Sequence, residues 1–242
     1  GFNIKAAFDN WQAAVDIYSA NFDHPAFKYD LYDAEAVPKI EEYSPSMIIG
    51  GPPCQDFSIA GARQRGKRAN LTIRYAEIVR DLTRRVLNAS LCGVPQIRRR
   101  FILVGHLGDK DDFLGELLDS RLSDKQMTVR DYLGDSLGTQ YFYMHPRNFQ
   151  RRGVFTIDEP AVTVRGTNRP IPPAYKRHHA DKADISEGVR ALTYKERSYL
   201  QTFPEEFEFV GSKTDIEQAI GNAVPVKLAD YVARCIADYA AD

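Results

Sequence analysis

A single cysteine in a stiff turn is the strongest candidate for chemistry in this sequence. Cys54 lies in the run Gly-Gly-Pro-Pro-Cys-Gln-Asp-Phe-Ser (residues 50–58), directly after the apolar segment 47–49. The apolar segment predicts a buried strand that ends in a loop, and the two prolines restrict the backbone around the thiol. Ligands of open α/β sheets bind at the carboxyl ends of strands, so this position suits a nucleophile.

Positive charge follows the cysteine along the chain, at Arg63, Arg65, Lys67 and Arg68. Neighbouring cations lower the pKa of a thiol and increase the fraction of thiolate, which is the reactive form. The alternative is a small, inert, buried residue, which is what most cysteines are. The Pro-Pro-Cys-Gln context favours the reactive interpretation.

Two aspartates end predicted strands near the start of the chain. Segments 4–8 and 27–29 are apolar enough for strands, and Asp9 and Asp30 follow them. A carboxylate at a strand end can accept hydrogen bonds from ribose hydroxyls or from an exocyclic amine of a nucleoside. The alternative is a turn or a helix cap, a common use of aspartate.

The charges of the chain are segregated although the formal net charge is only −1. Residues 63–100 carry eleven Lys or Arg against two acidic residues, and residues 140–180 carry seven against two. Local positive surface of this kind binds phosphates even when the overall charge is near zero. The alternative is a pair of solvated basic faces without a partner.

Apolar periodicity predicts strands that alternate with helices, which is typical of a parallel, doubly wound sheet. A smaller region follows at about residue 107, first acidic and then aromatic and basic. The predicted strands are 4–8, 27–29, 47–49, 86–89 and 101–104, and the predicted helices are 11–21, 71–82, 193–203 and 226–240.

Composition agrees with an intracellular globular protein. The chain has 242 residues, 43% of them hydrophobic, enough for a substantial core. We find neither an apolar run of the roughly 18 residues that span a membrane nor a secretory signal. Three cysteines without metal-ligand spacing argue against a disulfide framework and a zinc site, so we expect no metal.

Four motifs occur in the order found in the DNA cytosine-5 methyltransferases, and the sequence resembles that family over nearly its whole length. They are Pro-Pro-Cys-Gln at 52–55, Gly-Val-Pro-Gln-Ile-Arg-Arg-Arg at 93–100, Arg-x-Leu-Thr-x-x-Glu with Leu-Gln-x-Phe-Pro at 190–204, and Gly-Asn-Ala-Val-Pro at 221–225. The resemblance implies an α/β fold, the Rossmann-like, doubly wound sheet of S-adenosylmethionine-dependent methyltransferases, with a small target-recognition domain. We expect a catalytic and cofactor-binding domain at 1–119, a target-recognition region at 120–180, and helices at 181–242 that return to the catalytic domain.

The resemblance also implies a reaction. Cys54 would bond to C6 of a flipped cytosine so that C5 accepts a methyl group from S-adenosylmethionine, leaving S-adenosylhomocysteine. Arg98 and Arg100 match positions that contact the flipped base or order the site; phosphate binding or a solvated strand edge is the alternative for both. The implied cofactor-lining residues are Asp9, Asn10, Asp30, Leu31, Pro52, Leu71, Asn222 and Ala223. The expected DNA-binding residues are Gln55, Ser58, Arg63, Arg65, Arg68, Arg147, Arg165, Asn168 and Arg169, some of which would read base edges in the major groove.

Two family segments are missing from the sequence. The chain opens at Gly1-Phe2-Asn3, beyond the family's Phe-x-Gly-x-Gly-Gly loop. The Glu-Asn-Val run, whose glutamate contacts cytosine N3, is absent, because Asp81-Leu82-Thr83 leads directly into Arg84-Arg85-Val86. We therefore expect that the chain omits residues before Gly1 and near Thr83, or that it derives from a fragmentary gene.

The leading interpretation is a bacterial DNA cytosine-5 methyltransferase of the restriction-modification or orphan kind. It predicts a cytoplasmic, nucleoid-associated monomer that binds double-stranded DNA, with no membrane partner. A paired restriction endonuclease would share its DNA site without contacting it. Three alternatives stay open: a non-catalytic DNA-binding relative or truncated inactive form, an RNA cytosine-5 methyltransferase, and a redox thiol protein, which lacks support because Cys54 has no Cys-x-x-Cys partner.

Overall fold

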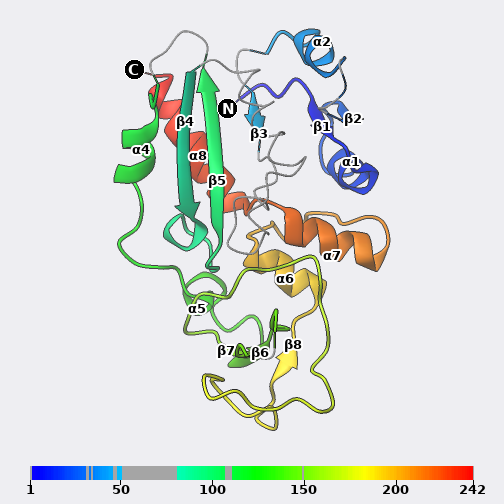
Figure 1. Cartoon of the computed structure of the whole chain (residues 1–242), viewed down its shortest axis with the longest axis vertical. Coiled ribbons are helices and arrows are strands. Elements are labelled where there is room, and N and C mark those ends of the chain that lie inside the picture. Colours follow the sequence, from blue (N-terminus) through cyan, green and yellow to red (C-terminus); the bar gives the residue numbers. More distant parts are fainter. Residues whose placement is uncertain are drawn as a thin grey trace.

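The computed structural model describes residues 2–30, 33, 35–45, 48–50, 81–106, 111–148 and 150–241. Three sheets organise this part of the chain, with strand orders β1-β2, β3-β5-β4 and β7-β6-β8. Figure 1 shows helices α4 and α8 beside the β3-β5-β4 sheet, and the β7-β6-β8 sheet at the opposite end of the molecule. The predicted strand and loop around Cys54 fall largely outside the described residues.

The first elements form a β-α-β unit, as predicted. Strand β1 (Ala7–Asp9) and strand β2 (Ala26–Lys28) pair in parallel, and helix α1 (Gln12–Ser19) connects them. Strand β1 begins later than the predicted segment 4–8, and its last residue, Asp9, lies opposite Lys28. Helix α2 (Ala36–Glu41) and the short strand β3 (Ile49–Gly50) follow.

The central sheet corrects two predictions. Strand β4 (Asp81–Asn88) contains the last two residues of the predicted helix 71–82, so that helix is wrong at its carboxyl end. All of its residues pair with strand β5 (Arg99–His106), and this tertiary pairing outweighs local helix propensity. The pair is antiparallel, as is β3 with β5, which contradicts a purely parallel sheet. The chain between β4 and β5 is too short for the crossover that a parallel pair requires.

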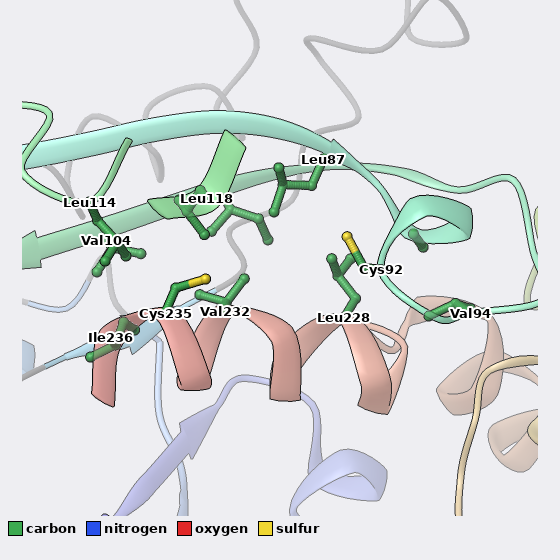
Figure 2. Packing of buried hydrophobic residues seen from close by; sticks show 12 residues of the cluster. Leu87, Cys92, Val94, Val104, Leu114, Leu118, Leu228, Val232, Cys235 and Ile236 are labelled. Carbon is green, nitrogen blue, oxygen red and sulfur yellow. The ribbon is translucent and has the colours of Figure 1, made fainter. Parts of the chain in front are cut away.

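Helix α8 (Val226–Tyr239) covers one face of β4 and β5 with an apolar stripe, as its periodicity predicted. Leu228, Val232 and Ile236 recur every four residues along it, and each is at most 6% exposed. Figure 2 shows them facing the side chains of the two strands and of helix α4 (Gly115–Ser120). This layer is the core that holds β5 and its arginines in place.

The second core lies around the small sheet. Strand β6 (Tyr141–Tyr143) pairs antiparallel with β7 (Val154–Thr156) and parallel with β8 (Arg190–Ala191). Phe142 and Phe155 stack on each other and pack against residues of three helices. These helices are α5 (Val129–Leu133), α6 (Tyr194–Leu200) and α7 (Lys213–Asn222). The predicted division into three regions at residues 119 and 180 stays a prediction.

The start of helix α6 matches its prediction closely. Thr193 is its N-cap, and its hydroxyl accepts from the backbone N–H of Glu196, whose carboxylate accepts from the N–H of Thr193. This reciprocal capping box satisfies two N–H groups that have no partner within the helix. None of the described helices is both long and apolar enough to cross a membrane.

Replacing Leu228 by Ala tests the packing of α8. The side chain is fully buried, and its loss removes apolar contacts and leaves a cavity. We therefore expect the free energy of unfolding to fall by about 2–5 kcal/mol. Val226→Ala is the control, because Val226 lies on the same helix and is 37% exposed. Urea unfolding measures both, and equal midpoints for the two variants would contradict this packing.

Candidate active site and nucleic-acid interface

Arg98 joins three distant segments of the chain through one buried guanidinium. Its side chain is 1% exposed and donates hydrogen bonds to the backbone carbonyls of Val164 (2.7 Å), Gly221 (2.6 Å) and Ala223 (2.9 Å). Neither a solvated strand edge nor a surface phosphate site fits this burial. Of the two roles that the family resemblance implies, these contacts support ordering of the site, which makes Arg98 a positioning residue.

Two buried glutamines strengthen the same junction. The side-chain amide of Gln96 donates to the carbonyl oxygens of Leu200 (3.1 Å) and of the Gln201 side chain (3.0 Å). Its oxygen accepts from the backbone N–H of Val164 at 2.8 Å, and Gln201 in turn donates to the carbonyl of Ile220. Gln96 and Gln201 lie within the sequence motifs, but their spacing alone gave no sign that they meet.

Gly221 allows the Gly-Asn-Ala-Val-Pro turn to touch the backbone of residues 165 and 166. A Cβ atom at this position would lie 2.0 Å from the nitrogen of Gly166 and 2.3 Å from the carbonyl carbon of Arg165. Both neighbours are backbone atoms and cannot swing aside. Glycine is therefore required here by close packing between the end of α7 and residues 165–166.

The predicted residues Arg100, Asn222 and Ala223 lie on the elements that this junction holds. Arg100 lies on β5, two residues after Arg98, which directly precedes the strand. Asn222 is the exposed last residue of α7, and Ala223 is fixed through its carbonyl by Arg98. The structure thus brings two motifs that are far apart in the sequence to one region.

Asp9 and Asp30 lie at one edge of the β1-β2 pair. Asp9 ends β1, Asp30 lies two residues beyond β2, and parallel pairing places both at the carboxyl ends of adjacent strands. Both are exposed, as is Asn10. One oxygen of Asp9 accepts from the backbone N–H of Trp11, the residue before α1, at 2.8 Å. Two exposed carboxylates at such an edge fit the hydroxyl and amine groups of a nucleoside.

The remaining thiols are unsuited to nucleophilic chemistry. Cys92 and Cys235 are buried in the core beneath α8. Burial raises the pKa of Cys92 to about 12, with a contribution from Cys235, and it also raises the pKa of Cys235. Both therefore stay protonated at neutral pH. Other predicted residues lie outside the described part of the chain: Leu31, Pro52, Cys54, Gln55, Ser58, Arg63, Arg65, Arg68 and Leu71.

The described residues of the predicted DNA-binding set differ in their surroundings. Arg169 is exposed and Arg165 is partly buried. The amide of Asn168 donates to the carbonyl of Leu192 and to the carboxylate of Glu217, both at 2.9 Å. This nitrogen is committed to the protein, so the geometry favours a positioning role for Asn168 over base reading. Among the described residues, no three His, Cys, Asp or Glu side chains are grouped to hold a metal ion.

The sequence profile of the C-5 cytosine-specific DNA methylase family matches residues 1–83 and 81–238. The chain belongs to this family. Its class of activity is therefore that of a DNA (cytosine-5-)-methyltransferase, and family members use S-adenosylmethionine as methyl donor. The α/β fold class predicted from the sequence is confirmed by this membership.

Relatives and solved structures agree. Type II methyltransferase M.HindV of Haemophilus influenzae is 48% identical and is aligned over 99% of this chain and 90% of its own length. M.HgiDI of Herpetosiphon aurantiacus is 45% identical and is aligned over 99% of this chain and 88% of its own length. The crystal structure of S. pombe Dnmt2 methyltransferase superposes with a TM-score of 0.60 at 16% identity, over 96% of this chain and 90% of that one. The crystal structure of a putative DNA modification methyltransferase encoded within an E. coli prophage superposes with a TM-score of 0.62 at 17% identity. That superposition covers 100% of this chain and 94% of the other. These two structures show the fold.

The family match breaks inside β4. Its two segments meet at residues 81–83, and the alignment with M.HindV extends over 275 positions although this chain has 242 residues. A stretch of the family is therefore absent from the interior of this chain. This break in the family match is where the sequence lacks Glu-Asn-Val, and β4 nevertheless pairs with β5 without interruption across it.

Replacing Arg98 by Gln tests the contacts that join Arg98 to residues 164, 221 and 223. The variant leaves buried carbonyls without donors, so we expect a loss of about 3 kcal/mol in the free energy of unfolding. Arg99→Gln is the matched control, because Arg99 is the exposed neighbour and should change stability by less than about 0.5 kcal/mol. Chemical denaturation followed by fluorescence measures both. Arg98→Gln with wild-type stability would show that the guanidinium does not hold the segments together.

Proposed function

We propose that Cys54 is the covalent catalyst with which this chain methylates C5 of a flipped cytosine in double-stranded DNA. The observation that carries the proposal is the state of the other thiols in a chain of this family. Cys92 and Cys235 are buried and protonated, so the motif cysteine is the one thiol left to act. In the sequence, Cys54 follows Gly50, the last residue of β3, by four residues, and the family resemblance expects the nucleophile at this position.

The proposed chemistry answers the weak nucleophilicity of cytosine C5. The Cys54 thiolate forms a bond to C6 of the ring, and the electron pair of the C5=C6 bond moves toward C5. S-adenosylmethionine supplies a methyl group attached to a sulfonium, and C5 takes this group. The C5 proton then leaves to a base, its bonding electrons restore the C5=C6 bond, and the C6–S bond breaks to return the thiolate. Removing the base from the stack costs a few kcal/mol.

The roles of the other residues follow from their places in the fold. Arg100, on β5 and two residues after the positioning residue Arg98, supplies a planar fork of donors that suits the carbonyl oxygen of cytosine. Asp9 and Asp30 fit the ribose hydroxyls and the adenine amine of the cofactor, beside Asn10. Asn222 and Ala223 would border the same cofactor from α7. The arginines around residues 147–169 would hold the DNA.

The biological setting that we infer is bacterial restriction-modification. M.HindV and M.HgiDI are named as Type II methyltransferases and align over nearly all of this chain. On this proposal the protein acts as a monomer on chromosomal DNA in the cytoplasm. A cognate endonuclease would recognise the same sequence without binding this chain.

Cys54→Ser should reduce methyl incorporation into duplex DNA to background, because a hydroxyl cannot replace the thiolate in the addition to C6. DNA affinity should stay within about 0.5 kcal/mol of wild type, as for a surface substitution. The control is Cys235→Ala, which changes a buried thiol in the core and should keep incorporation.

A second measurement traps the bond itself. Duplexes with 5-fluorocytosine cannot lose a C5 proton, so wild type should form a complex that survives denaturing gel electrophoresis. Cys54→Ser should form none. Methylation by this variant, or a trapped complex with it, would exclude Cys54 as the nucleophile.

A second candidate function is DNA binding without turnover. The break in the family match at residues 81–83 favours it, because the missing Glu-Asn-Val run supplies the glutamate that promotes attack at C6 in the family. Without a partner for cytosine N3, addition of the thiolate leaves negative charge on the ring uncompensated. The chain would then bind DNA and cofactor while methylating slowly or not at all.

An insertion at the break in the family match distinguishes the two candidate functions. The residues of M.HindV that align opposite the break are placed between Leu82 and Thr83, and methyl incorporation is compared with the unaltered chain. We expect a gain of at least about 100-fold, the lower end of what one placed proton donor or acceptor contributes. A Gly/Ser insertion of equal length is the control. No gain over this control would show that the missing segment does not limit activity.

A further inference from the structure

We propose that a pocket beside Arg165 binds one phosphate of the DNA backbone, without reading sequence. We call it the arginine pocket; its lining includes Tyr143, His145, Thr163, Arg165, Thr167 and Asn168. The choice of DNA as the ligand rests on the proposed function. It specifies the role of Arg165, which the sequence suggested only as one of several DNA-binding residues.

The charge at this pocket is not compensated. Among the described residues, no carboxylate lies within ion-pair distance of Arg165 or Arg169. Other arginines in the same part of the chain pair with acidic groups: Arg130 with Asp158, Arg152 with Glu159, Arg190 with Glu196 and Arg197 with Glu217. Arg197 also lines the pocket, but its charge is paired with Glu217. The charge available for an external anion is therefore that of Arg165, and Arg169 lies close enough to add to it.

The pKa shifts of Arg165 and His145 indicate the same local positive charge. Burial lowers the pKa of Arg165, and the charges of Arg147 and Arg169 lower it further. Burial likewise lowers the pKa of His145, with added effects of Arg169 and Arg165. Like charges that face each other in a partly buried site raise the free energy of the free protein. An anion in the pocket would remove this repulsion.

The pocket is held rigidly by buried contacts. The guanidinium of Arg165 donates to the backbone carbonyl of His145, and the carbonyl of Arg165 accepts from Arg197. Arg197 and Glu217 are 3% and 6% exposed at their side chains and pair with each other, and Asn168 donates to the same carboxylate. Glu217 is therefore occupied inside the protein and does not neutralise Arg165. A site ordered before binding loses little entropy when the ligand arrives.

A backbone phosphate fits this arrangement better than a base edge. Arg165 is partly buried and fixed at one nitrogen, so its side chain lacks the reach of an arginine that enters the major groove. A phosphate protrudes from the duplex and accepts hydrogen bonds from several donors at once. Phosphate contacts position the duplex and carry no sequence information directly, so the pocket would set the register of the DNA on the protein.

The test measures how DNA affinity depends on salt. Arg165→Gln and Arg169→Gln are compared with Arg234→Gln, a control on α8 whose side chain is 75% exposed and pairs with Asp230. Each pocket variant should lower the slope of log affinity against log salt by about 1, because one phosphate contact is lost. The loss should be equal for duplexes of unrelated sequence, and Arg234→Gln should keep the slope.

Two outcomes would overturn the proposal. An unchanged slope in both pocket variants would show that no phosphate contact was lost, and a loss confined to one duplex sequence would show base reading. Arg169 is exposed, so its variant tests the pocket even if Arg165→Gln unfolds. Titration with inorganic phosphate is a further arm: we expect no saturable binding, and saturable binding that Arg165→Gln abolishes would indicate a free-anion site instead.

The experiment is independent of catalysis. It uses Cys54→Ser protein without cofactor and measures binding alone, so failure of methyl transfer would leave its result intact. Conversely, wild-type slopes in both pocket variants of an active enzyme would reject the pocket while the proposed reaction stands.

Discussion

The buried guanidinium of Arg98 is the interaction on which the site depends. Taking a charged group out of water is costly unless its hydrogen bonds are replaced, and here three backbone carbonyls replace them. The acceptors come from residues 164, 221 and 223, which lie far along the chain from Arg98. One side chain therefore fixes where the second core meets the sheet that carries Arg100. Gln96 and Gln201 make the fit specific, since each buried amide also requires its own partners.

Sequence periodicity predicted several elements correctly, including segments 86–89 and 101–104, which lie largely within β4 and β5, but it missed the start of β4. The unit of β1, α1 and β2 and the helices α6 and α8 follow from apolar spacing and from the Thr193 cap. Strand β4 was mistaken at its start for the end of a helix, because residues 81–88 are strand only through their pairing with β5. The internal contacts of Arg98 and Asn168 were likewise hidden, since a polar residue in a motif gives no sign of facing inward.

Two large apolar residues of the β3-β5-β4 sheet are exposed. Ile49 on β3 and Val86 on β4 are 59% and 63% exposed, although both are large apolar residues in strands of one sheet. Strands of α/β sheets normally have both faces covered. The family match breaks within β4, between these two positions in the sequence. Ile49 and Val86 therefore differ from the buried apolar residues that β4 and β5 turn toward α8.

The junction at Arg98 also connects chemistry with DNA positioning. Val164, one of its acceptors, is followed directly by Arg165, and Gly221 packs on the backbone of the same residue. Asn222 and Ala223, next to Gly221, would line the cofactor site. A displacement of residues 164–166 would therefore move the arginine pocket and the end of α7 together. Because buried hydrogen bonds couple the two, the proposed DNA contact and the proposed cofactor site would be positioned by the same residues.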